Sequence, residues 1–241
     1  MKKLNVLIVI LLFTAISAKL QAQTIDEIVE KHVQALGGMD KLSSIKSLKM
    51  TGKFSGNGWE APVTFTMKRP DMVRMEINFQ GNASVQAFDG TTAWEINPWS
   101  GKKEADKMPA EGVKDMREMA DIDGPLVNYK QKGYTAELMG KDDMEGSEVY
   151  KIRLTDKDGD IRYFYLDSQT YLILKETKKR KIKEKETESE TYYGNYQPIE
   201  GGVIMAMSME FKQPGSDQSQ KGTIEKTEVN TDVDDSIFKM P

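Results

Sequence analysis

The sequence predicts a mainly β protein of the α+β class, in which about eleven antiparallel strands form a curled sheet with the helices in or across its concave side. Large apolar residues occupy every second position in most segments between Leu48 and Val229, which is typical of strands with one buried face. Short turns between these segments favour an antiparallel meander. Only two or three segments have helical spacing, too few to cover a flat sheet, so we expect a curled sheet around an incompletely filled apolar cavity.

The first 22 residues have the pattern of a secretory signal peptide, which leaves one domain over residues 23–241. Two lysines precede an apolar run from Val6 to Ile16, and small or polar residues follow it. We expect cleavage after Ala22, with Ala18 as the alternative site. The run is short for a transmembrane helix, so an uncleaved membrane anchor is the less favoured interpretation.

Composition excludes several classes of protein. Removal of residues 1–22, which carry three lysines and no acid, changes the formal net charge from −4 to −7. An acidic chain without a basic stripe is not expected to bind nucleic acid. The chain contains no cysteine, so it has no disulfide and no thiol for lipid attachment. An exported protein of this kind depends on its hydrophobic core.

The helical segments lie at the start and the middle of the chain. Thr24 and Glu27 form a capping-box pattern before apolar residues at helical spacing, and Gly37-Gly38 ends that helix. A short helix is expected from about Asp40 to Ile45. The strand pattern breaks at Pro109. An amphipathic helix is expected after this break, with the apolar positions Val113, Met116 and Met119.

The strands follow from the alternation of apolar and polar side chains. They are expected at 48–54, 63–67, 73–79, 85–88, 94–96, 134–139, 149–154, 161–166, 171–175, 203–211 and 224–229. The charged run at 175–190 is interpreted as a solvated hairpin, with a docking surface as the alternative.

Three methionines mark the strand at 203–211. Met205, Met207 and Met209 share its apolar face. Methionine is flexible and suits surfaces that accept variable apolar shapes, although it also fills ordinary cores. The shortage of covering helices favours the wall of an adaptable cavity.

Catalytic motifs are missing from the sequence. The single histidine, His32, is expected to be partly exposed on the first helix, without a partner motif. Asp156, Asp158 and Asp160 fit a hairpin turn better than a calcium loop, because the glycine is one position early and the later glutamate is missing. We therefore expect no enzyme activity, no catalytic residue, no metal and no cofactor.

A resemblance to a known family rests on the order of several short motifs. The series is Lys68-Arg69-Pro70-Asp71, then Asp89-Gly90 with Trp94, then Asn97-Pro98-Trp99. It resembles the periplasmic lipoprotein carriers of the LolA type, and more closely the outer-membrane lipoprotein-sorting proteins of Gram-negative bacteria. The similarity spans essentially the whole mature chain.

The resemblance implies a half-barrel of antiparallel strands with helices as a lid, which we expect over residues 113–129. It also implies a monomeric periplasmic carrier that binds lipoprotein acyl chains, or a related lipid, under this lid. It also implies an inner-membrane complex that releases the cargo and an outer-membrane acceptor. At the position of Arg69 the carriers have an arginine that hydrogen-bonds the lid backbone and sets the balance between open and closed states. The resemblance therefore implies a latch role for Arg69, with a strand-end arginine that only caps a turn as the alternative. The alternative function is an envelope sensor or regulatory module that binds a protein partner. The expected cavity residues are Phe65, Met67, Met75, Ile77, Trp94, Met205, Met207 and Met209.

Overall fold

The computed structural model describes residues 23–182, 185–214 and 218–241. The predicted signal peptide lies outside the described residues. Within these ranges, none of the helices combines the length and the apolar character needed to cross a membrane.

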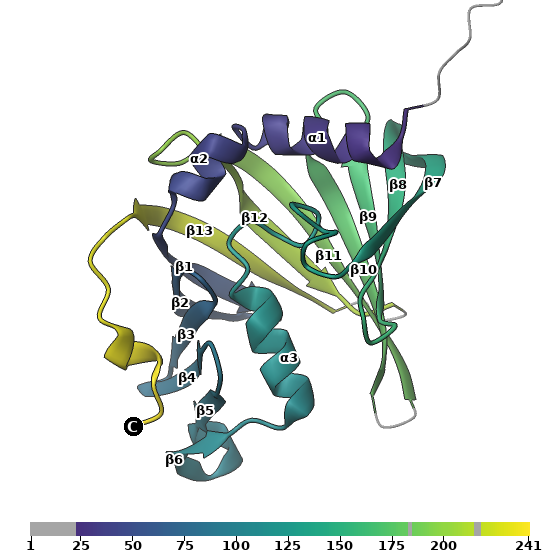
Figure 1. The fold of residues 1–241 in the computed structure, drawn as a ribbon. Helices are drawn as coiled ribbons and strands as arrows, with labels where there is room; N and C mark the ends of the chain where they lie inside the picture. Colours follow the sequence, from purple (N-terminus) through teal and green to yellow (C-terminus); the bar gives the residue numbers. More distant parts are fainter. Residues whose placement is uncertain (1–22, 183–184, 215–217) are drawn as a thin grey trace, which may run out of the picture.

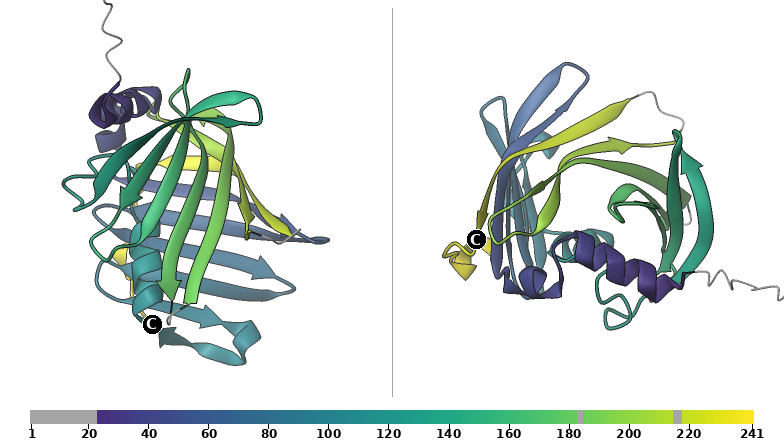
Figure 2. Two further views of the ribbon diagram at one scale, coloured as in Figure 1. Left: turned by 90° about the vertical axis from the view of Figure 1, so that its right-hand side faces the viewer. Right: turned by 90° about the horizontal axis from the view of Figure 1, so that it is seen from above.

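One antiparallel sheet of thirteen strands forms the body of the protein, with the order β6-β5-β4-β3-β2-β1-β13-β12-β11-β10-β9-β8-β7. The sheet curls, so that Figure 2 shows it from above as an arc with the helices across its open side. The curled antiparallel half-barrel is thereby confirmed. The strands are β1 (Ser47–Gly56), β2 (Trp59–Lys68), β3 (Met72–Phe79), β4 (Asn82–Asp89), β5 (Ala93–Asn97), β6 (Lys102–Lys107), β7 (Thr135–Met144), β8 (Ser147–Thr155), β9 (Ile161–Asp167), β10 (Ile173–Ile182), β11 (Lys185–Pro198), β12 (Ile204–Lys212) and β13 (Ser219–Val229).

Two strands lie beyond the eleven counted from the sequence. β6 is a short edge strand that pairs with β5 and was not expected, and β11 forms with β10 the hairpin expected from the charged run. The charged run at 175–190 lies in this hairpin. A charged strand shows no contrast between apolar and polar positions, so the period-two pattern that marks the other strands is absent from it.

The first two helices lie along one end of the half-barrel (Figure 1). α1 (Ile25–Ala35) begins with the predicted capping box, in which the Thr24 and Glu27 side chains each bond the other's backbone N–H. α2 (Met39–Ser44) follows directly. Gly37 makes the turn between them at φ 112°, and a Cβ there would lie 2.7 Å from the carbonyl oxygen of Gly202. The methionine strand starts at this junction, where the Ile204 N–H donates to Leu36 O at 2.9 Å.

Two apolar clusters connect the helices to the sheet. Ile28 and Val29 of α1 pack with Tyr150 and Ile152 of β8. The third helix, α3 (Ala110–Met119), has Pro109 as its N-cap and packs against β3, β4 and β5. The concave side is therefore covered by α1 at one end of the half-barrel and by α3 beside β3, β4 and β5 (Figure 1).

The C-terminal segment crosses the convex side of the sheet. It ends in the 3-10 helix η2 (Asp235–Phe238), which contacts β3 and β4. Phe238 is fully buried there, and its carbonyl oxygen accepts a hydrogen bond from Trp94 Nε1 at 2.8 Å.

Candidate functional site: an apolar trough under a charged lid

The concave face carries an apolar trough between α3 and the strand ends. We define the trough by Met50, Phe54, Phe65, Met75, Ile77, Met209 and Phe211. Strand register places the trough side chains on one face, since Phe65 lies opposite Met50 of β1 and Met75 of β3. All seven are only partly buried, unlike the core beneath α1 and α3.

Aromatic contacts organise the trough. The ring of Phe54 meets Phe65 and Phe211 edge to face, with centroids 6.0 and 5.9 Å apart. A small cavity of about 10 Å³ lies beside Phe54, Phe65 and Met209. That volume holds about one water molecule, so this cavity is too small for an acyl chain in this conformation.

A second aromatic row continues the trough towards the hairpin ends. Phe79 makes edge-to-face contacts with Trp59 and Trp99, at centroid distances of 6.0 and 6.4 Å. Trp99 is 51% exposed. Trp59 and Phe79 follow Phe65 and Ile77 on the same face, so strand alternation could have identified both as trough residues.

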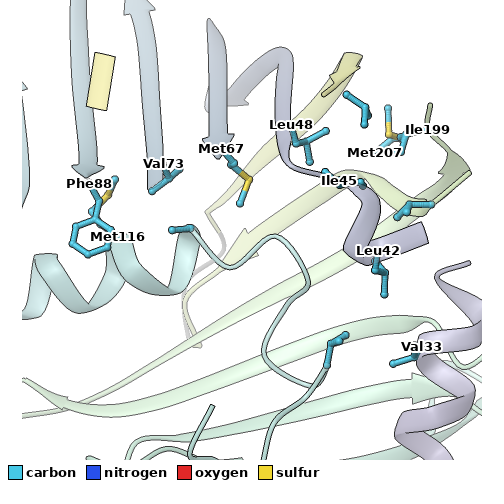
Figure 3. Close-up of a cluster of buried hydrophobic side chains, with 14 of the residues drawn as sticks. Val33, Leu42, Ile45, Leu48, Met67, Val73, Phe88, Met116, Ile199 and Met207 are labelled. Atoms are coloured by element: carbon cyan, nitrogen blue, oxygen red, sulfur yellow. The ribbon is translucent and has the colours of Figure 1, made fainter. Parts of the chain in front are cut away.

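The predicted cavity residues of β2 and β3 lie on the concave face. Phe65, Met75 and Ile77 are partly exposed in the trough, whereas Met67 is 6% exposed and packs against Val73 in the core (Figure 3).

The three methionines of β12 have different surroundings, although register places all three on the concave face. Met207 is buried in the core beside Ile199 (Figure 3). Met205 packs against that core. Met209 alone reaches the small cavity of the trough. Two of the three methionines therefore belong to the core, and the third belongs to the trough.

Trp94 does not line the concave face, which corrects the prediction made from sequence. Its neighbour Ala93 pairs with Phe88 on the concave side, so Trp94 points to the convex side with Ala87 and Val85. The alternation of the two strand faces agrees with the prediction. The register of the Asp89-Gly90 hairpin, however, decides which of the two alternating sets of side chains faces the concave side.

The predicted lid begins with α3. Met116 is 2% exposed and packs on Phe88 (Figure 3), while Val113 and Met119 pack at the edge of the same core. The guanidinium of Arg117 lies over the Phe88 ring, 5.7 Å from its centroid. One face of the lid is thus fixed to the wall formed by β3 to β5.

Arg69 connects the sheet to both helical segments. Its Nε donates to Ile45 O at 2.7 Å and its Nη2 to Leu42 O at 3.1 Å, at the end of α2. The guanidinium also forms a bidentate pair with Asp123, at 2.5 and 2.8 Å, in the turn that follows α3. Hydrogen bonding to Asp123 raises the pKa of Arg69 despite partial burial. Arg69 therefore reaches the lid through a carboxylate, and its backbone partners belong to α2.

The opposite face of α3 is ionic. Lys114 contacts three carboxylates of the turn between β8 and β9, with Nζ 2.5 Å from Asp156, 3.1 Å from Asp158 and 2.7 Å from Asp160. Burial alone would lower the pKa of Lys114, but these hydrogen bonds raise it. The triplet thus holds a lysine ammonium. Among the described residues, no group of His, Cys, Asp and Glu side chains is placed to hold a metal ion.

Asp115 and Glu118 extend this contact to the basic residues of β9 and β10. Glu118 pairs with Arg162 and Lys178, and Asp115 pairs with Arg180 at 2.7 Å. The β10–β11 hairpin is therefore not solvated on both faces, which corrects the sequence interpretation. Its inward side chains face the lid, whereas Lys179 between them is 50% exposed.

His32 is also buried, at 3% exposure, rather than partly exposed as expected. Its Nδ1 lies 2.8 Å from Tyr171 O, and burial lowers its pKa. The side chain closes the packing between α1 and the start of β10, away from the trough.

A wider groove of about 690 Å³ lies on the convex face, beside the C-terminal segment. Its charged residues are already paired in part, since Arg74 contacts both Glu76 and Ile237 O, at 2.6 and 2.8 Å. It lacks the continuous apolar surface of the trough.

Comparison with solved structures supports a LolA-like fold. A LolA superfamily protein from Nitrosomonas europaea matches with a TM-score of 0.60 and 13% identity over 90% of this chain and 98% of that one. A domain described as an outer-membrane lipoprotein-sorting protein, from Vibrio parahaemolyticus, has a TM-score of 0.60 and 12% identity over 89% of this chain and 97% of that one. A DUF1329 family protein from Desulfovibrio piger has a TM-score of 0.65 and 12% identity over 90% of this chain and 98% of that one. No family model matches the sequence, and no curated protein matches it significantly.

Proposed function

We propose that this protein is a periplasmic carrier that binds the acyl chains of lipoproteins, or of related lipids, in the concave trough. The partly exposed apolar side chains around Phe65 and Met209 carry the proposal, because an uncovered apolar surface inside a curled sheet is a binding surface for hydrocarbon. The LolA-like fold and the signal-peptide pattern support the same role. Uptake requires no covalent step.

Burial of hydrocarbon provides the driving force, at about 25 cal/mol for each Å² removed from water. The cavity beside Phe54, Phe65 and Met209 is too small for an acyl chain in this conformation, so the chain must displace these side chains or lie across them. Methionine has three rotatable side-chain bonds and adapts at low cost. An adaptable trough suits a carrier that must also release its cargo.

The lid sets access to the trough. Arg69 holds the turn after α3 against the end of α2, and the ion pairs of α3 hold the helix against β9 and β10. Loading would require the lid to move away from at least one of these attachments. We assign the latch role to Arg69 on this basis.

The direct test replaces Met209 by aspartate and measures lipid that copurifies from the periplasm, by native mass spectrometry. A charge in the trough should remove the bound lipid while the circular dichroism spectrum stays unchanged, because Met209 lies outside the core. Ser208→Asp is the matched control, since Ser208 points to the other face of β12. Met207→Asp should instead unfold the domain, because that side chain is buried.

Equal lipid content in Met209→Asp and the wild type would refute the carrier proposal. Copurification of a protein in place of lipid would favour the alternative of an interaction module.

A further inference from the structure

The inner face of β9 and β10 carries three basic side chains. Arg162 of β9 lies opposite Lys178 of β10, and Arg180 follows two positions later on the same face. Their side chains are only 13%, 19% and 11% exposed. Burial of three cations costs free energy unless each has a partner. We call these three residues the basic wall.

The basic wall has few partners of its own. Glu176 lies on the same face, 3.4 Å from Arg162, and accepts a hydrogen bond from Tyr193 at 3.0 Å. Asp160 lies 3.7 Å from Arg180 Nε but is shared with Lys114. Glu176 thus neutralises Arg162, and the wall retains excess positive charge at its other two members.

The lid supplies the missing carboxylates. Glu118 contacts all three members of the basic wall, with Arg180 Nη2 at 3.6 Å, and Asp115 contacts Arg180 and Lys178 at 2.7 and 3.4 Å. The carboxylates of the lid do not satisfy every donor of the basic wall. Arg180 Nε and Nη2 are buried and have no hydrogen-bond partner among the described residues. A buried guanidinium with two unsatisfied nitrogens has unused capacity for an oxyanion.

The basic wall lies close to the trough. Phe211 of the trough pairs with Thr191 of β11, and Thr191 pairs with Glu176 of β10. A single strand therefore separates the trough from the wall, a lateral distance of about 10 Å at the usual strand spacing. Tyr193 spans this step, since it lies beside Met209 and hydrogen-bonds Glu176. A ligand with an apolar tail and a charged head can reach both.

We propose, on the basis of the carrier function above, that the ligand is an amphiphile with an anionic phosphate or carboxylate head. The tail occupies the trough, and the head binds Lys178 and Arg180 in place of the Asp115 and Glu118 carboxylates. The acidic face of α3 is thus an internal competitor for the head, and loading exchanges one set of ion pairs for another.

Binding of three probes with the same tail tests this proposal: hexadecyl phosphate, hexadecanoate and hexadecanol. The two anions are titrated below their micellar concentrations, and the alcohol below its solubility limit. The fluorescence of Trp59 and Trp99, beside the trough, reports binding. The two anionic probes should bind at least about tenfold more tightly than the alcohol, the effect of one charge-assisted hydrogen bond.

Variants locate the effect. Lys178→Gln with Arg180→Gln should weaken both anionic probes about tenfold and leave hexadecanol unchanged, which also shows that the trough remains folded. Lys179→Gln, on the outward face of the same strand, is the matched control and should change nothing. Asp115→Asn with Glu118→Gln should strengthen the anionic probes more than the alcohol, because the competing carboxylates are removed.

Equal affinity of the wild type for all three probes would overturn the anionic-head proposal and leave the carrier function standing. Failure of every probe to bind would refute both. Inorganic phosphate that binds as tightly as hexadecyl phosphate would identify a free anion as the ligand and overturn the amphiphile.

Discussion

Replacement of Arg69 by methionine should release the lid while the sheet stays folded. Methionine keeps most of the aliphatic stem and removes the guanidinium, with its bonds to Ile45 O, Leu42 O and Asp123. Asp123 would then retain a carboxylate that is only 13% exposed and has lost its bidentate partner. The free energy of lid docking, rather than that of global unfolding, should therefore fall.

The size of the effect follows from the burial of the pair. Removal of one partner from a fully buried ion pair costs about 3–5 kcal/mol, and a single hydrogen bond to a charged group contributes about 1.5–3 kcal/mol. Arg69 is 25% exposed, so water recovers part of the loss. We expect the free energy of lid docking to fall by about 3 kcal/mol, which corresponds to roughly a hundredfold increase in the equilibrium constant for lid opening.

Native-state amide hydrogen exchange measures this opening. In Arg69→Met, the amides of residues 113–129 should exchange about a hundredfold faster, while those of β8 and β9 keep their protection. Lys68→Met is the matched control. Lys68 is the adjacent residue, but its Nζ contacts Val233 O and Asp235 on the convex side, at 2.7 and 2.5 Å. Unchanged lid exchange in Arg69→Met, or equal acceleration throughout the sheet, would refute the latch.

Two further predictions concern the helices at the end of the half-barrel. Burial lowers the pKa of His32 in the folded protein, so on acidification the unfolded chain takes up a proton at a higher pH than the folded chain does. The free energy of unfolding should therefore decrease as the pH falls below about 6.5. Urea titrations at pH 7.5 and 5.5 should show this loss in the wild type; an equal loss in His32→Gln would exclude His32 as its cause. Gly37→Ala should destabilise by about 2 kcal/mol or more, because its Cβ would strike Gly202 O at 2.7 Å, whereas Gly58→Ala, with open space, should cost only about 1 kcal/mol of backbone strain. Equal shifts in urea midpoint would contradict the steric explanation.

The sequence carried enough information for most of the fold. The Thr24 capping box, the Gly37-Gly38 stop and the Pro109 break are local signals, and each helix begins or ends where they predict. Amphipathic strands were equally visible, since one apolar face is a local property. Local patterns also led to a curled sheet, because the number of helices was too small to cover it.

The sequence could not show which alternate residues face inwards. Trp94 and Phe88 are both large and apolar, and only the hairpin register places Phe88 in the concave core and Trp94 under the C-terminal segment. The same limit applies to the charged hairpin. Lys178 and Lys179 are both lysines, yet the Lys178 side chain is 19% exposed and contacts α3, whereas the Lys179 side chain is 50% exposed. Burial of a charge depends on a partner distant in sequence, here Glu118.

The lid itself connects the two kinds of surface inside the half-barrel. Met116 fixes α3 to the apolar wall, while Glu118, two positions later and on another side of the helix, contacts the basic wall. An apolar contact tolerates small displacements, because dispersion and burial are non-directional. An ion pair, in contrast, no longer stabilises the contact once a competing anion binds the cation. The helix therefore has one attachment that holds it in place and one that a ligand can exchange. A carrier needs both properties, since its lid must stay with the protein when the cargo enters.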